Sequence, residues 1–104
     1  MAMVLMLSLC VSVVQAAPAT GQGLAQARQC LACHQVDTRR VGPPFTAIAA
    51  RFGGQEGAQA YLAQVIQKGS TGQWGAIPMP AQPQVSATDA QRLAHWILSL
   101  QPAK

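Results

Sequence analysis

Two cysteines and a histidine stand close together in the sequence Cys30-Leu31-Ala32-Cys33-His34. Thiols three positions apart project to one side of a helical turn, so each could add across one vinyl group of a porphyrin. The imidazole that follows could offer a ring nitrogen to the porphyrin iron. Thioredoxin-like redox sites and zinc knuckles share the cysteine spacing, but the adjacent histidine favours covalent attachment of a c-type haem.

The iron of such a haem needs a ligand on its second face if the protein is to carry electrons. Met79 is the only methionine after residue 6, and a proline stands on each side of it. These prolines hold the backbone extended and reduce the entropy lost when the thioether is fixed on the iron. We therefore predict that His34 and Met79 bind the iron. Core packing is the alternative role for this methionine.

His95 is the only other histidine and the alternative second ligand. It lies about a hundred degrees around the last predicted helix from the neighbouring Trp96, which belongs to the apolar stripe, so we expect it at the edge of the helix or on the surface. Ligation by His34 and Met79 leaves no position on the iron for substrate or dioxygen. We therefore expect outer-sphere electron transfer and no enzymatic activity.

Residues 1–16 form an apolar run that ends in small residues and is too short for a comfortable membrane span. We interpret it as a signal peptide, cleaved after residue 16 or as late as residue 19, that exports the protein to the periplasm without stable membrane insertion. No Lys or Arg precedes the run, so the start amine supplies the positive charge or the true start lies upstream. An uncleaved anchor is the alternative. Lipidation of Cys10 is disfavoured because Leu9 stands where a small residue is normally required.

Removal of the leader leaves one domain, residues 20–104, in which Cys30 and Cys33 are the only cysteines. A disulfide closing so small a loop would constrain the unfolded chain little. A chain of this size also builds a marginal apolar core. One buried haem c, attached through both cysteines, would therefore serve structure as well as function.

The chain carries seven Lys+Arg against three Asp+Glu, a formal net charge of +4. The basic residues are spread along the sequence without interleaved aromatic residues, a pattern that argues against nucleic-acid binding. Electrostatic steering towards an acidic patch on a redox protein partner fits this charge, as does simple solubility.

Apolar periodicity predicts helices over residues 20–33, 46–52, 55–68 and 86–100, and no strand or internal repeat. Thr46 and Ser86 are the expected N-caps, and glycines 53 and 69 together with Pro102 are the expected stops. Residues 69–85 have no helical period. A loop this long in so small a domain usually has a function.

Over residues 23–100 the sequence resembles the small bacterial monohaem class I cytochromes c, specifically the cytochrome c-551 type. The resemblance implies an all-α fold, with about four helices wrapped around one covalently attached haem that has an exposed edge. It rests on five motifs: Cys30-x-x-Cys33-His34, Val41-Gly42-Pro43-Pro44, Gly69-Ser70-x-Gly72-x-Trp74-Gly75, Ile77-Pro78-Met79-Pro80 and Leu93-Ala94-x-Trp96-Ile97-Leu98.

The resemblance implies thioether links at both motif cysteines and axial ligation by His34 and Met79. It also implies that the carbonyl of Pro43 holds the second nitrogen of His34, an outer-shell role. Trp74 would donate its indole N–H to a haem propionate; packing against the haem face is its alternative role, and both can hold together.

Three positions depart from the family pattern. Gln82 stands where an Asn often lies near the sulfur, Val65 where a basic residue often lies near a propionate, and Ala25 where the first helix often has an aromatic residue. These departures bear on the reduction potential, its pH dependence and the packing against Trp96, and leave the ligands untouched.

We therefore expect a monomeric periplasmic electron carrier. The resemblance implies a respiratory cytochrome complex as its donor and a nitrite reductase or terminal oxidase as its acceptor. The first alternative is a haem subunit permanently docked to a periplasmic dehydrogenase. A haem sensor or peroxidase from which Met79 dissociates is a third possibility. A haem-free dithiol protein of the thioredoxin class ranks last, because the sequence has no βαβ pattern.

Overall fold

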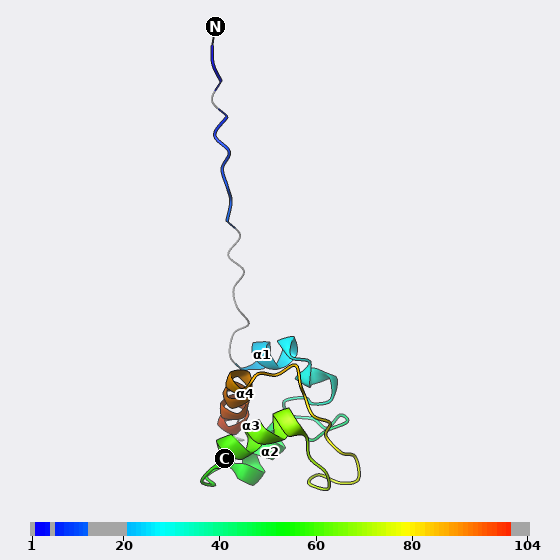
Figure 1. Cartoon of the computed structure of the whole chain (residues 1–104). Coiled ribbons are helices and arrows are strands. Elements are labelled where there is room, and N and C mark those ends of the chain that lie inside the picture. Colours follow the sequence, from blue (N-terminus) through cyan, green and yellow to red (C-terminus); the bar gives the residue numbers. More distant parts are fainter. Residues whose placement is uncertain (1, 5, 13–20, 101–104) are drawn as a thin grey trace.

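The computed structural model describes residues 2–4, 6–12 and 21–100. Within residues 21–100 four α-helices and one 3₁₀ turn surround the core, as the all-α prediction required. Figure 1 shows helices on one side of the domain and the long loop after α3 on the other. The elements are α1 (Gln22–Ala27), η1 (Cys30–Ala32), α2 (Phe45–Phe52), α3 (Ala58–Lys68) and α4 (Ala87–Ser99).

Residues 2–4 and 6–12 are exposed and adopt neither helix nor strand. In the part of the chain that the structure describes, no helix has the length and apolar character needed to cross a membrane. Residues 13–20, which contain both predicted cleavage sites, lie outside the described residues.

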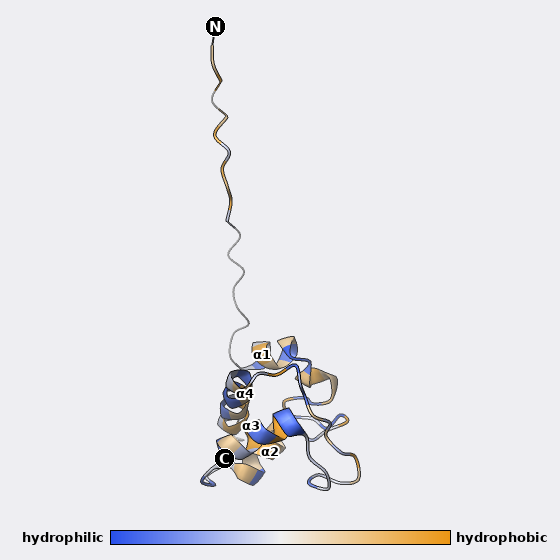
Figure 2. Ribbon diagram, viewed as in Figure 1, coloured by the Kyte–Doolittle hydropathy of each residue, from blue (hydrophilic) through white to orange (hydrophobic). Residues whose placement is uncertain are grey.

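The C-terminal helix α4 organises the packing, since it contacts α1, α2 and α3. Leu93, Ala94 and Ile97 are buried on its inner face, at the helical spacing that the sequence showed. Figure 2 shows polar residues along much of the remaining length of this helix. The Oγ of Ser86 accepts a hydrogen bond from the backbone N–H of Asp89 at 3.1 Å, which confirms the predicted N-cap.

The carboxylate of Asp89 joins the end of α1 to the start of α4. Its two oxygens lie 3.1 Å from the guanidinium of Arg28 and 3.5 Å from that of Arg92. Both arginine side chains are partly exposed, so solvent screening reduces the contribution of each pair to stability.

The first predicted helix is wrong in its extent. The helix α1 ends at Ala27, and the next turn of chain reverses direction through Gln29, whose φ of 67° places it in the left-handed region. The cysteine motif therefore starts a separate 3₁₀ turn, η1, in which the N–H of Cys33 bonds to the carbonyl of Cys30 at 3.2 Å. Residues three apart eclipse one another in such a turn, so both thiols still lie on one side.

Two other helix starts differ from the prediction. Pro44 occupies the N-cap position of α2, while the Thr46 hydroxyl donates to the carbonyl of Val36 at 3.0 Å instead of capping the helix. The helix α3 begins three residues late because Gly57, at φ 77°, forms a left-handed turn before it. Both predicted glycine stops are confirmed, and Pro102 lies outside the described residues.

The loop over residues 69–85 forms no helix, as predicted, and contains one pairing of strand type. Ser70 and Met79 form an isolated antiparallel bridge, with N···O distances of 3.0 and 2.9 Å. The bridge closes the base of the intervening segment, residues 71–78, which bounds one side of the cavity described below.

Candidate haem site

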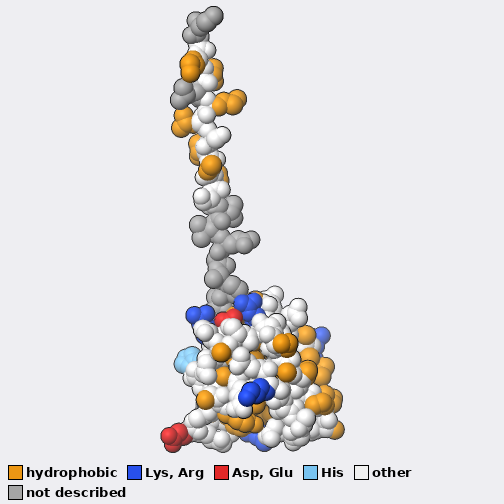
Figure 3. All heavy atoms as spheres, in the orientation of Figure 1, with side chains coloured by type: hydrophobic (Ala, Val, Ile, Leu, Met, Phe, Trp, Pro, Cys, Tyr) orange, Lys and Arg blue, Asp and Glu red, His pale blue; other side chains and the backbone are white. Residues whose placement is uncertain are grey.

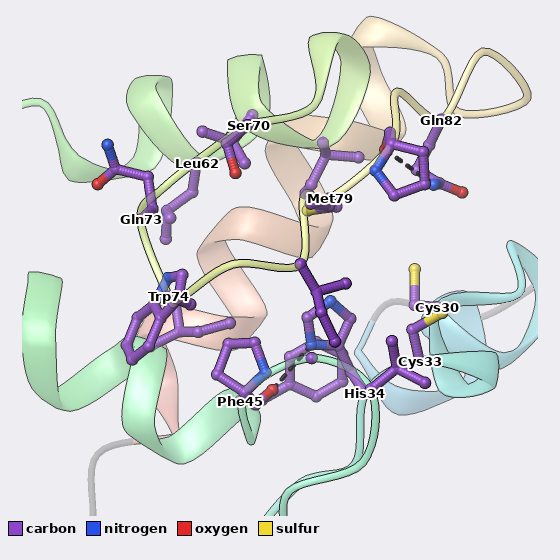
Figure 4. Close-up of a pocket in the computed structure, with 18 of the residues that line it drawn as sticks. Cys30, Cys33, His34, Phe45, Leu62, Ser70, Gln73, Trp74, Met79 and Gln82 are labelled. Atoms are coloured by element: carbon purple, nitrogen blue, oxygen red, sulfur yellow. Dashed lines mark hydrogen bonds between the residues drawn. The ribbon is translucent and has the colours of Figure 1, made fainter.

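One cavity opens between the helices, η1 and the 69–85 loop. Figure 4 shows the two cysteines at one end of this cavity, Trp74 at the other, and His34 and Met79 on opposite walls. The interior wall is built by buried apolar side chains from three helices: Ile48 of α2, Leu62 and Ile66 of α3, and Leu93 and Ile97 of α4. A flat apolar ring system fits such a wall, whereas a hydrated ion or a polar substrate does not.

Cys30 and Cys33 both line the cavity, and neither is in a disulfide. Cys30 is half-buried, and this burial raises the pKa of its thiol. Cys33 is exposed at the mouth. Among the described residues no cluster of three or more His, Cys, Asp or Glu side chains could hold a metal ion.

The backbone after η1 fixes the His34 ring. The N–H of Gly42 bonds to the carbonyl of Cys33 at 2.8 Å, and the N–H of Phe45 bonds to the carbonyl of Gln35 at 2.9 Å. These bonds bring the Pro43 carbonyl to 2.8 Å from Nδ1 of His34. A carbonyl only accepts, so Nδ1 carries the proton and Nε2 keeps a free lone pair that can bind a metal.

Two neighbours hold the imidazole from its sides. The Phe45 ring stacks on it with centroids 5.1 Å apart and planes 21° apart, and Trp96 supports Phe45 edge-on at 5.3 Å. Gly42 lies so close that a Cβ there would fall 2.6 Å from Cε1 of His34. The ring is only 8% exposed. Phe45 and Gly42 were not assigned roles from the sequence, although both lie inside or beside the Val41-Gly42-Pro43-Pro44 motif.

Met79 is positioned through its backbone. Both its N–H and its carbonyl bond to Ser70. Gly69 lies close to the peptide groups that follow Met79, and a Cβ on Gly69 would be 2.5 Å from the Met79 carbonyl oxygen. Its half-buried side chain lines the cavity. The Ser70–Met79 bridge therefore constrains the backbone of Met79 in addition to the flanking prolines. The sequence did not indicate this bridge.

Trp74 lines the far end of the cavity and is half-buried. Among the described residues its indole N–H has no hydrogen-bond acceptor, so the donor is available to a group in the cavity. His95 is exposed on α4, as expected.

The three departures from the family pattern are placed as follows. Gln82 lines the cavity, and its amide donates to the Pro80 carbonyl at 3.0 Å. Val65 lines the cavity as well, whereas Ala25 is fully buried in the core. The aromatic partner of Trp96 is Phe45 of α2.

Comparison with known proteins agrees with this geometry. The Cytochrome c family model matches residues 18–101, so the chain belongs to the cytochrome c family. It is 56% identical to cytochrome c-551 of Pseudomonas aeruginosa over 67% of this chain and 66% of that protein. It is 51% identical to cytochrome c-552 of Nitrosomonas europaea over 74% of this chain and 75% of that protein.

The solved structures point to the same type. The crystal structure of wild-type Nitrosomonas europaea cytochrome c552 matches with a TM-score of 0.74 and 50% identity, over 75% of this chain and 96% of that one. The chain is thus a small class I monohaem cytochrome of the c-551 type, with one haem c attached covalently through Cys30 and Cys33. Haem supplies a one-electron iron centre, and the family is one of electron-transfer proteins.

Proposed function

We propose that the protein is a soluble periplasmic electron carrier whose haem iron is held by His34 and Met79. One observation carries the proposal: the free Nε2 side of a buried imidazole and a backbone-clamped thioether face each other across the cavity that the two motif cysteines enter. A thioether and an imidazole on the two faces give a high reduction potential relative to two imidazoles. They also leave no open position for substrate.

Two further residues would act on the haem site without binding the iron. The Pro43 carbonyl accepts from Nδ1 of His34, which fixes the ring and makes it a better donor. Trp74 offers its unused indole N–H to a propionate at the other end of the cavity. The Pro43–His34 hydrogen bond supports the first role, and the place of Trp74 in the cavity lining supports the second.

Electron exchange needs a haem edge that a partner can approach. Cys33 is exposed, and the apolar Val41 and Ile77, which also line the cavity, are 47% and 64% exposed. Figure 3 shows hydrophobic side chains gathered on the side of the domain that carries η1 and the 69–85 loop. Such a surface suits brief docking of a redox protein, with a respiratory cytochrome complex as donor and a nitrite reductase or terminal oxidase as acceptor.

The proposal is tested on protein purified from the periplasm of cells that carry out haem attachment. We expect a mass equal to residues 17–104 plus one haem, a ferrous spectrum of a six-coordinate haem, and no carbon monoxide binding at neutral pH. Colourless protein would exclude the site. Carbon monoxide binding would favour a sensor or peroxidase, and an unprocessed N-terminus would exclude cleavage at residue 16.

A haem subunit permanently docked to a periplasmic dehydrogenase is the alternative. The exposed apolar side chains at the mouth of the cavity would suit a permanent interface as well. Size-exclusion chromatography of native extract at high salt separates the two: a carrier elutes as a free monomer, whereas a subunit comigrates with the enzyme.

A further inference from the structure

Arg51, in the last turn of α2, lies over the indole of Trp74. The centre of its guanidinium is 4.7 Å from the Trp74 ring centroid and 5.3 Å from that of Phe52. The same guanidinium donates to the backbone carbonyl of Gln73 at 2.5 Å and to the side-chain oxygen of Gln73 at 3.5 Å. Arg51 therefore holds both the ring of Trp74 and the backbone immediately before it.

These contacts matter because the segment 71–78 has little else to hold it. The Ser70–Met79 bridge closes its base, but within the segment every residue except Trp74 is exposed. Gly72 and Gly75 both have positive φ, and a Cβ at either would meet nothing within 4 Å. A planar guanidinium can stack on a ring and donate hydrogen bonds at once. Arg51 supplies a second anchor, midway along the segment.

We propose that Arg51 is a positioning residue that fixes Trp74 and the 71–78 segment against the haem. The inference rests on the proposed function, because it assigns Arg51 a task at the same haem site. The indole ring of Trp74 would then keep its orientation in the cavity wall without a hydrogen bond from the polypeptide to its N–H.

The test uses the two tryptophans of the ferrous holoprotein as a matched pair. Hydrogen exchange of each indole N–H is followed by NMR, with the Trp74 resonance assigned from Trp74→Phe. Arg51→Met keeps an unbranched apolar stem but removes the guanidinium with its charge and its donors. We expect exchange at Trp74 to accelerate about fivefold or more, while exchange at Trp96 on α4 stays unchanged.

Two more variants complete the comparison. Lys68→Met removes the same charge at the end of α3, outside the cavity lining, and should change neither rate. Arg51→Lys keeps a cation and should give a Trp74 rate between those of the wild type and Arg51→Met; it also supplies the comparison if Arg51→Met does not accumulate.

An unchanged Trp74 rate in the Arg51 variants would overturn the inference. An equal acceleration at both tryptophans would do so too, because it would indicate loss of global stability. The mass of the wild-type protein distinguishes failure of this inference from failure of the proposed function. A protein that carries no haem contradicts the proposed function before any Arg51 variant is compared.

Discussion

The thioether of Met79 is the one iron ligand that the proposed site takes from the long loop. Replacing it by histidine puts a nitrogen donor in place of the sulfur, within the same backbone clamp. We expect Met79→His to retain its covalent haem, lose the sulfur-to-iron absorption band and show a markedly lower reduction potential, because imidazole favours ferric iron more than a thioether does. Visible spectroscopy and a redox titration measure both effects. An unchanged spectrum would show that Met79 does not bind the metal.

Gly42 leaves room for His34, the other proposed ligand. A Cβ at this position would lie 2.6 Å from Cε1 and 2.9 Å from Nδ1 of His34, so Gly42→Ala must push the ring away from the Pro43 carbonyl. We expect a loss of about 1–3 kcal/mol in the free energy of unfolding, as for other overpacked sites, and a changed ferric spectrum. Denaturant titration of the holoprotein measures the first effect. A variant with wild-type stability and spectrum would contradict the close contact.

At the scale of elements, a glycine joins α3 to the loop that carries Met79. Gly69 combines φ 77° with ψ 179°, a region that only glycine occupies readily, and it touches the peptide groups after Met79. We expect Gly69→Ala to destabilise the holoprotein by about 3 kcal/mol or more and to weaken the sulfur-to-iron band.

Gly57 provides the matched control at the other end of α3. It also has φ 77°, but a Cβ there meets nothing within 4 Å, so Gly57→Ala isolates the backbone strain, about 1–2 kcal/mol. Denaturant titration and the absorption spectrum are compared for the two variants. Equal losses, or a weakened band in Gly57→Ala, would contradict a direct link between Gly69 and the Met79 loop.

The sequence predicts these elements well where they depend on residues near one another in the chain, and poorly where they depend on residues far apart. The α4 stripe and its Ser86 cap are local patterns, so they were predictable. The break at Gln29 was not, because a non-glycine residue takes a positive φ here without any local signal. Thr46 follows the N-terminus of α2 as a cap would, yet its hydroxyl bonds to Val36, ten residues earlier. In the case of Thr46 a distant contact overrides the local pattern.

The site shows the same division. The cysteine motif and the single downstream methionine stood out by residue type and spacing alone. The stacking of Phe45 on His34, the Ser70–Met79 bridge and the position of Arg51 over Trp74 join residues distant in the sequence or depend on backbone geometry. Residue types alone therefore pointed to the groups that we propose for the haem, and the fold shows which contacts hold these groups in place.

At the scale of the whole molecule, the cavity lies against the apolar core, and buried residues of α2, α3 and α4 form its interior wall. A haem in this cavity would add to the small apolar core that a chain of this size can build. We expect the double variant Cys30→Ala/Cys33→Ala to lose covalent haem, and the resulting chain to show weak near-ultraviolet dichroism and a broad, non-cooperative thermal transition. Cooperative unfolding of this variant at the wild-type midpoint would show that the polypeptide core suffices without the cofactor.

The distribution of charge leads to the last prediction. Asp89 is paired with Arg28 and Arg92, so much of the net positive charge lies elsewhere. Arg39 lines the cavity mouth, and Arg40 follows it in the same exposed loop. If an acidic partner docks at the haem edge, these two side chains meet it first and raise the encounter rate.

We therefore expect the rate of electron transfer to an acidic redox partner to fall as salt is added. Arg39→Gln/Arg40→Gln should lower the rate at low salt several-fold and flatten its salt dependence, because fewer charges steer the encounter. Arg92→Gln, on α4, removes one charge whose side chain does not line the cavity, and should leave most of the dependence intact. Stopped-flow experiments at several ionic strengths measure the electron-transfer rate of the wild type and of both variants. Equal salt slopes for the wild type and the double variant would place the docking surface away from this edge of the haem cavity.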